Sequence, residues 1–330
     1  MKRHLLTLIL SLAPAIAQQP TSVEERAIQF PTDSLIAPGT LALPAGHSHR
    51  VPLLVLVAGS GVQDRDATVG PNKVFQQLAQ GLAQRGIATL RFDRRIKFDR
   101  ASFFAHPDLD HEVVIDAVSA LAYAATLPEI DPGQIYLLGH SLGAELAPDI
   151  VAARLQQKPG SVRGMILLSG NARPIDVVIL GQMHSLGQAQ GATPAQIDSI
   201  AAAWTQVFTA ARDPKTPDSE PLGVCAKLPA RYWRDWLRRD PTKTLSTLSI
   251  PALILRGTND LNVLHEDFEL MRKAATAPKS AAREFPGLNH EYMAAPGDRS
   301  VLIKGEIAPE VLDTISQWVT TGHIEQAASL

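Results

Sequence analysis

The sequence predicts an α/β fold in which a mostly parallel central sheet is covered by helices on both faces. Short apolar runs of strand length show no polar alternation, which is typical of strands that are buried on both faces. Helical patterns separate these runs, as the crossovers of a parallel sheet require. One long segment, residues 173–248, has helical patterns without a convincing strand, and this predicts an insertion between two parts of the sheet.

The composition is that of a folded globular protein. The chain has 330 residues, of which 45% are hydrophobic and 19% charged, so it can bury one sizeable core. Its 31 Lys and Arg residues nearly balance its 33 Asp and Glu residues. No strong field therefore points to nucleic acid or to an acidic polymer as a partner.

The first 17 residues have the layout of a cleaved signal peptide. Lys2 and Arg3 form a positive start, residues 5–13 are apolar, and Ala15-Ile16-Ala17 is a small-x-small site. The alternative is a frayed hydrophobic N-terminus. We expect cleavage, export to the periplasm or the extracellular space, and no stable membrane insertion afterwards, because the apolar run is too short to span a bilayer comfortably.

The remaining chain divides into a core and an insertion. Residues 18–172 and 249–330 form the two parts of the core, and residues 173–248 form a helical cap over a site. The alternative for the insertion is a long surface excursion without a role. The only cysteine, Cys225, excludes an intramolecular disulfide, and we expect it to be buried as an apolar residue rather than to act as a reactive thiol.

The expected elements follow in order along the chain. Residues 29–49 form a hairpin whose turns are signalled by Pro38-Gly39 and Ala45-Gly46. Apolar residues at helical spacing predict a helix over residues 74–84, ended by Gly86. Apolar runs predict strands over residues 53–57, 87–92, 135–138, 164–168, 252–255 and 283–285. Further helices are expected over residues 113–127, 142–155, 195–211, 231–239 and 309–319, and from about residue 265.

The segment Gly139-His140-Ser141-Leu142-Gly143 has the G-x-S-x-G pattern of a nucleophile elbow. It lies between an expected strand and an expected helix, which is the context that this motif requires. A serine at such a turn sits in strained backbone with its Oγ exposed, and the flanking glycines leave room for the turn. The pattern predicts Ser141 as a catalytic nucleophile. The alternative is an ordinary serine in a tight turn.

A serine nucleophile needs a base, and the base needs an acid. His290, in a polar loop after the last expected strand, is the best placed of the ten histidines. Asp260 follows the strand at 252–255, and catalytic groups of open α/β sheets gather at the carboxyl ends of strands. The order serine, acid, histidine fits this assignment. A turn aspartate that caps its own backbone is the alternative. The rival acids are Glu266, Asp267 and Glu291.

Acyl transfer also needs an oxyanion hole. Leu142, the residue after the nucleophile, is expected to supply one backbone N–H. The loop Ala58-Gly59-Ser60-Gly61 after the first parallel strand is expected to supply the other, from Ser60 or, as second choice, from Gly61. No Lys-Ser or Lys-Thr pair follows this loop, which disfavours a phosphate-binding loop.

Two charged segments have less specific patterns. Asp64-Arg65-Asp66 either orders the oxyanion loop through ion pairs or is a solvated charged loop. Residues 106–111 contain metal-ligand residue types, but they lack a helical or finger-like spacing. We therefore expect neither a metal ion nor a cofactor.

Taken together, these motifs resemble the bacterial carboxylesterases of the α/β-hydrolase superfamily. The matches, spread from about residue 53 to 320, are Gly59-Ser60-Gly61 with Asp64-Arg65-Asp66, Arg91-Phe92-Asp93-Arg94-Arg95, the elbow at Ser141, the strand ending at Asp260, and Asn289-His290. The chain departs from the usual pattern at Ala58, where many members carry His, and at Ile96-Lys97-Phe98, where a Gly-rich turn is common. Both departures bear on the shape of the acyl pocket.

The resemblance implies the hydrolysis of short acyl esters, small-molecule substrates, through an acyl-Ser141 intermediate. Three alternatives stay open. A peptidase or aminoacyl hydrolase on the same fold uses the same tetrahedral chemistry. A thioesterase is disfavoured by the expected export, away from coenzyme A. A non-catalytic binding module that kept the fold is disfavoured by the complete set of catalytic residue types.

Overall fold

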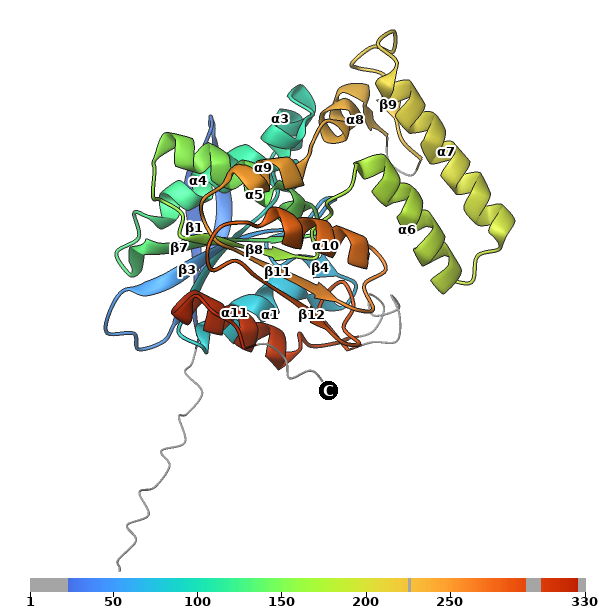
Figure 1. Ribbon diagram of the computed structural model, residues 1–330. Coiled ribbons are helices and arrows are strands. Elements are labelled where there is room, and N and C mark those ends of the chain that lie inside the picture. Colours follow the sequence, from blue (N-terminus) through green and yellow to red (C-terminus); the bar gives the residue numbers. More distant parts are fainter. Residues whose placement is uncertain (1–22, 225–226, 295–303, 326–330) are drawn as a thin grey trace, which may run out of the picture.

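The centre of the molecule is an eight-stranded sheet with the strand order β1-β2-β6-β3-β7-β8-β11-β12 (Figure 1). The computed structural model describes residues 23–224, 227–294 and 304–325. The strands of the sheet are β1 (Val23–Thr32), β2 (Leu35–Pro44), β3 (Val51–Val57), β6 (Ala88–Phe92), β7 (Ile130–His140), β8 (Gly164–Leu168), β11 (Ala252–Gly257) and β12 (Ala281–Phe285). Strands β6 to β12 of this order pair in parallel, and β1 and β2 add an antiparallel hairpin at one edge. The predicted mostly parallel sheet is confirmed.

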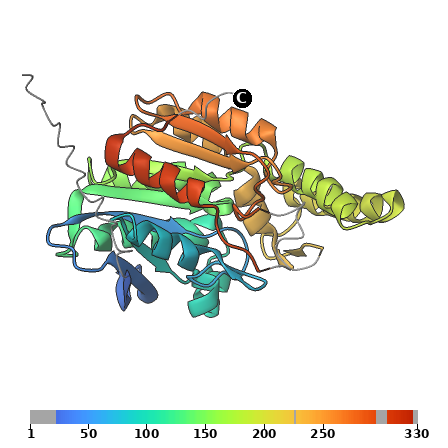
Figure 2. The ribbon, with the colours of Figure 1, turned by 90° about the horizontal axis from the view of Figure 1, so that it is seen from below.

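Helices cover both faces of the sheet. Helices α1 (Val74–Ala83) and α11 (Pro309–Thr321) pack on the face that Figure 2 shows. On the opposite face lie α4 (Ile115–Ala124), α5 (Leu142–Gln157) and α10 (His265–Ala274). The neighbouring residues Leu53 and Leu54 point into these two different cores, and both are fully buried. This is why the sequence of β3 is an unbroken apolar run.

One of the two predicted turns of the N-terminal hairpin is wrong. Pro38 and Gly39 lie inside β2, and the chain turns at Asp33 and Ser34 instead. Gly39 allows a close approach of strands, because a Cβ there would lie 2.9 Å from the carbonyl oxygen of Arg91 on β6. The glycine therefore marks tight strand pairing, which has the same local signal as a turn.

Several short elements had no sequence signal. The helix predicted over residues 113–127 starts as a π-helix, η1 (Asp110–Val114), and continues as α4. The other unpredicted elements of the core are α2 (Arg95–Phe98), α3 (Arg100–Ala105), β4 (Thr68–Val69) and β5 (Asn72–Lys73). Elements of two to six residues are too short to show a periodic apolar pattern.

The segment between β8 and β11 is mainly helical. It contains α6 (Ile175–Ala189), α7 (Pro194–Arg212), β9 (Pro221–Leu222), β10 (Leu228–Pro229), α8 (Ala230–Leu237) and α9 (Pro241–Thr247). Helices α6 and α7 form a hairpin that projects beyond the core (Figures 1 and 2), whereas α9 packs against α5 and α10. Helix α8 reaches the core through hydrogen bonds from Tyr232 to Glu112 and from Trp236 to Glu145. The predicted signal peptide at residues 1–17 and the single cysteine, Cys225, lie outside the described residues.

Candidate active site

Ser141 occupies a strained turn between the end of β7 and the start of α5. Its backbone dihedrals are φ 54° and ψ −119°, a left-handed φ that non-glycine residues rarely adopt. A Cβ at position 139 would lie 2.2 Å from the carbonyl oxygen of Gly143, and a Cβ at position 143 would lie 2.1 Å from that of Val57. Both glycines of the motif are thus required by the backbone around Ser141.

The structure brings His290 and Asp260 together from the loops after β12 and β11. The Nδ1 atom of His290 lies 2.9 Å from Oδ2 of Asp260, and both side chains are buried. The other carboxyl oxygen, Oδ1, accepts the backbone N–H groups of Asn262 (2.8 Å) and Val263 (2.9 Å). Because Nδ1 of His290 donates its hydrogen to the carboxylate of Asp260, Nε2 is the ring nitrogen that can take a proton from a nucleophile.

Electrostatics keep Asp260 ionised. Burial alone would raise the pKa of its carboxyl, but the neighbouring His290 and the hydrogen bond from the backbone of Val263 outweigh it, so the pKa lies below its ordinary value. The rival acids have other partners. Glu266 and Asp267 form ion pairs with Arg173, and Glu291 accepts a hydrogen bond from the side chain of Asn289.

His140, the residue before Ser141, contacts the loop that contains His290. Its Nε2 lies 2.9 Å from the carbonyl oxygen of His290, and the two rings are 4.6 Å apart. Burial and the nearby His290 lower the pKa of His140 to about 3, so its ring is neutral and can donate one N–H to that carbonyl. Its position beside Ser141 was the only available signal for this contact.

Two further strained residues support the same loop and were not predicted. Tyr292 (φ 62°) and Ser169 (φ 50°) both have left-handed backbone. The hydroxyl of Ser169 donates to that of Tyr292 (3.0 Å), which in turn donates to the carbonyl of Leu255 on β11 (2.7 Å). Strain of this kind persists only where the surroundings impose it. Here it lies directly after β8, the strand between β7 and β11, and in the loop that contains His290.

The predicted oxyanion residues lie beside Ser141. Ser60, Gly61 and Leu142 line a cavity of about 240 Å³ together with Ser141. The loop approaches closely, because a Cβ at Gly59 would lie 3.1 Å from the Cβ of Ser141. Leu142 is the first residue of α5, and the first N–H groups of a helix have no partner within the helix.

Ion pairs anchor the loop that follows, as one of the two readings of Asp64-Arg65-Asp66 expects. Arg65 pairs with Asp93 (2.6 Å), and Asp66 pairs with Arg91 (2.9 Å), which is almost fully buried. Asp64 accepts hydrogen bonds from the hydroxyl of Thr68. The segment is therefore ordered by its charges rather than freely solvated.

Ser141 lines two cavities of about 240 Å³ each. The lining of the cap-side cavity combines polar groups, among them Asn171 and Gln182, with apolar and aromatic side chains of α6, α8 and β10: Ile175, Ile179, Leu228, Tyr232, Trp233 and Trp236. The histidine-side cavity contains His290 and several polar residues: Gln63, His140, Gln182, Asn262 and Glu291. Larger cavities, of about 410 and 650 Å³, lie elsewhere and contain none of the predicted catalytic residues.

The residues at 106–111 pair with one another and with the cap. His111 contacts Asp108 (2.7 Å) and stacks on His106 (4.6 Å between ring centres). Within the described ranges, no group of three or more His, Cys, Asp and Glu side chains is placed to hold a metal ion. Nor is any helix in these ranges both long and apolar enough to cross a membrane.

Comparisons with known proteins bear on the fold and the family. Esterase EstD of Thermotoga maritima is 31% identical over 292 residues, which are 86% of this chain and 65% of that protein, so the chain spans just under two thirds of this relative. Est1E from Butyrivibrio proteoclasticus has a TM-score of 0.56 at 18% identity, covering 90% of this chain and 98% of the other. The Pyrobaculum calidifontis esterase has a TM-score of 0.59 at 16% identity, covering 90% and 85%.

These two structures share the fold. A model of the alpha/beta hydrolase family matches residues 30–301, which are most of the chain. The nucleophile elbow at Ser141, the sheet order and this match lead to one conclusion: the chain belongs to the alpha/beta hydrolase family.

Proposed function

We propose that the protein is a serine hydrolase that cleaves carboxylic esters of small acyl groups through an acyl-Ser141 intermediate. One observation carries the proposal. A serine in strained backbone at a nucleophile elbow lines the same cavity as a histidine whose Nδ1 contacts a buried carboxylate, Asp260. The printed name of the Thermotoga maritima relative, an esterase, supports the same reaction class.

The steps follow from these positions. Ser141 Oγ attacks the ester carbonyl while His290 Nε2 takes its proton, and Asp260 stabilises the resulting imidazolium. The backbone N–H groups of Ser60 and Leu142 hold the negative oxygen of the tetrahedral intermediate. When the intermediate collapses, His290 returns the proton to the departing alcohol. Water then attacks the acyl-enzyme by the same route and releases the acid.

The proton path also orients the substrate. The departing alcohol must lie within reach of His290, and this places it in the polar histidine-side cavity. The acyl group then lies in the cap-side cavity, where the apolar and aromatic side chains of α6 and α8 and the volume of about 240 Å³ favour a short chain. The α6 and α8 helices of the insertion would thus select the acyl group.

The test is ester turnover by the protein and by Ser141→Ala. We expect turnover of p-nitrophenyl esters of short acyl chains, a decline as the chain lengthens, and loss of activity in Ser141→Ala. Ser199→Ala, an exposed serine of α7, is the control and should keep full activity. Full activity of Ser141→Ala in a clean preparation would refute the proposal. Turnover of aminoacyl amides but of no ester would favour the peptidase alternative.

We also propose that residues 1–17 act as a signal peptide and that the protein is exported. The charge and apolar pattern of this segment supports the proposal. Cell fractionation followed by intact-mass measurement tests it. We expect a periplasmic or extracellular product that lacks residues 1–17. A full-length product in the cytoplasm would contradict it.

A further inference from the structure

The Arg94 side chain, two residues beyond β6, is buried against the oxyanion loop. Its Nη2 atom donates hydrogen bonds to the carbonyl oxygens of Ala58 (2.5 Å) and Gly59. The backbone N–H of Arg94 donates to the carbonyl of Gln63 (3.3 Å), and the side chain of Gln63 donates to the carbonyl of Ser60 (3.2 Å). The side chain and the backbone of Arg94 thus hold the two ends of the loop, the second end through Gln63. Only 5% of Arg94 is exposed.

The geometry of a peptide bond connects this contact to catalysis. The carbonyl of Gly59 and the N–H of Ser60 belong to one peptide plane, and in a trans peptide these two groups point in opposite directions. A guanidinium that holds the Gly59 carbonyl toward the protein interior turns the Ser60 N–H the other way. Ser60 lines both cavities that contain Ser141. The charge of Arg94 also polarises this peptide and strengthens its N–H as a donor.

Glu112 connects Arg94 to the cap residue Tyr232. Its Nη1 lies 3.3 Å from Oε1 of Glu112 on η1, and Oε2 of Glu112 accepts the hydroxyl of Tyr232 on α8 (2.8 Å). All three side chains are buried. Burial and the nearby carboxylate raise the pKa of Tyr232 well above its ordinary value, so its hydroxyl stays a donor. The ring of Tyr232 lines the cap-side cavity.

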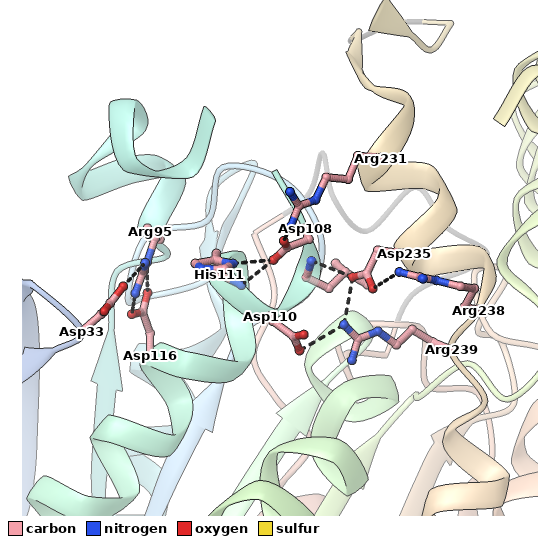
Figure 3. Close-up of polar contacts among 11 residues, drawn as sticks. Asp33, Arg95, Asp108, Asp110, His111, Asp116, Arg231, Asp235, Arg238 and Arg239 are labelled. Carbon is pink, nitrogen blue, oxygen red and sulfur yellow. Dashed lines mark hydrogen bonds and ion pairs between the residues drawn. The ribbon is translucent and has the colours of Figure 1, made fainter. Parts of the chain in front are cut away.

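A row of polar contacts keeps α8 in register with η1 (Figure 3). Asp235 accepts the backbone N–H of Leu109 (2.9 Å). Arg231 pairs with Asp108 (2.7 Å), and Arg239 pairs with Asp110 (3.0 Å). Tyr232 lies on α8 between these residues, so its hydroxyl has a fixed position over Glu112.

We propose that Arg94 is a positioning residue of the oxyanion hole, and that Glu112 and the cap residue Tyr232 hold it in place. Through this chain of contacts, the cap that lines the acyl cavity also sets the orientation of the Ser60 N–H. The inference rests on the proposed function. It predicts that removing Arg94 weakens transition-state binding while it leaves ground-state binding of the ester nearly unchanged.

The test compares Arg94→Met, Arg94→Lys and the double variant Arg94→Met/Glu112→Met in the full chain. We expect kcat per titrated active site to fall about a hundredfold in Arg94→Met, the usual effect of losing an oxyanion donor, with little change in KM. The inhibition constant of a trifluoromethyl ketone, whose adduct carries the oxyanion, should rise by the same factor as kcat/KM falls. Arg94→Lys should recover part of the loss.

The double variant separates positioning from stability. Arg94→Met alone leaves Glu112 buried without its counter-ion, whereas the double variant removes both charges and should recover stability in urea unfolding. We expect it to recover no activity. The matched control is Arg95→Met/Asp116→Met, which removes the neighbouring buried ion pair that does not contact the loop, and it should keep kcat per titrated site. Tyr232→Phe should lower kcat less than Arg94→Met does.

Two results would overturn the proposal: an unchanged kcat per titrated site in Arg94→Met, or an unchanged inhibition constant of the ketone. An unchanged kcat in Tyr232→Phe would show that Tyr232 takes no part in positioning Arg94. Labelling by a fluorophosphonate distinguishes this proposal from the proposed function. If the unaltered protein does not react, the proposed function fails. If it reacts and Arg94→Met reacts equally fast, only the positioning role fails.

Discussion

The carboxyl group of Glu145 is buried in α5 beside the cap-side cavity. Its Oε1 accepts the indole N–H of Trp236 on α8 (2.6 Å), and its Oε2 accepts the side-chain N–H of Asn171 (3.3 Å). Burial raises the pKa of Glu145 to about 7. The two hydrogen bonds oppose this rise, Asp267 adds to it, and Arg239 reduces it. The carboxyl is therefore largely protonated in the folded protein under mildly acidic conditions.

The raised pKa predicts how stability depends on pH. In the unfolded chain the carboxyl ionises near its ordinary pKa of 4.5, whereas in the folded protein it holds its proton up to about pH 7. Between these two values the folded state binds more protons, so the free energy of unfolding falls as the pH rises. With about 1.4 kcal/mol for each pH unit, the loss across this window is about 3 kcal/mol. Above the folded pKa both states are ionised and the contribution is constant.

Glu145→Gln isolates this contribution. The amide is neutral at every pH and keeps an acceptor for Trp236. Asn171 Oδ1, which finds no hydrogen-bond partner among the described residues, can accept the new N–H if its amide turns over. We expect the stability of the unaltered protein relative to Glu145→Gln to fall by about 3 kcal/mol from about pH 4.5 to about pH 7 and then to level off.

The assay is urea unfolding across this pH range, with the difference between the two proteins taken at each pH so that all other titrating groups cancel. Glu24→Gln, a substitution of an exposed glutamate of β1, is the control and should follow the unaltered protein. A difference that is flat with pH, or one that grows in favour of the unaltered protein as the pH rises, would refute the reasoning.

Three further predictions concern single substitutions. Asp260→Asn removes the charge that orients His290 and should lower kcat by about ten-thousandfold with little change in KM, measured by steady-state kinetics; a decrease of less than tenfold would contradict its role. Gly143→Ala places a Cβ 2.1 Å from the carbonyl oxygen of Val57 and should lower the free energy of unfolding, measured in urea, by more than about 3 kcal/mol. An unchanged unfolding midpoint would contradict the conclusion that the backbone requires glycine at this position. Asp116→Asn leaves the fully buried Arg95 without its main counter-ion and should lower the free energy of unfolding by about 3–5 kcal/mol. Asp313→Asn, in the exposed pair with Arg85, should lower it by less than about 1 kcal/mol. Equal decreases in urea unfolding would refute the argument from burial.

The sheet and the main helices were predictable because their signals are local. A strand buried on both faces is mostly apolar, and β3 and β8 show this directly. β6 and β11 each also bury one arginine, Arg91 and Arg256, in an ion pair. The elbow was predictable for a similar reason, since a strand, a glycine-flanked serine and a helix follow one another in the chain. The Pro38-Gly39 prediction failed because a glycine required for close strand pairing has the same local signal as a glycine in a turn.

The contacts that support the site could not be read from local patterns. Residues 112 and 232 are far apart in the sequence, yet Glu112 and Tyr232 share a hydrogen bond under the cap-side cavity. The same holds for His140 and the carbonyl of His290. Such pairs depend on how the elements pack together in the fold, and the local sequence around either residue does not predict its partner. The order of serine, aspartate and histidine predicted which groups to examine, but only the fold places Asp260 2.9 Å from His290.

The proposed reaction depends above all on Ser141 as the nucleophile. The most direct test is to treat the protein with a fluorophosphonate, to digest it, and to locate the modified residue by mass spectrometry. We expect a single phosphonylated peptide modified at Ser141, no labelling of Ser141→Ala, and loss of ester turnover in proportion to labelling. Stoichiometric labelling at another residue, or full ester turnover after complete labelling of Ser141, would contradict it.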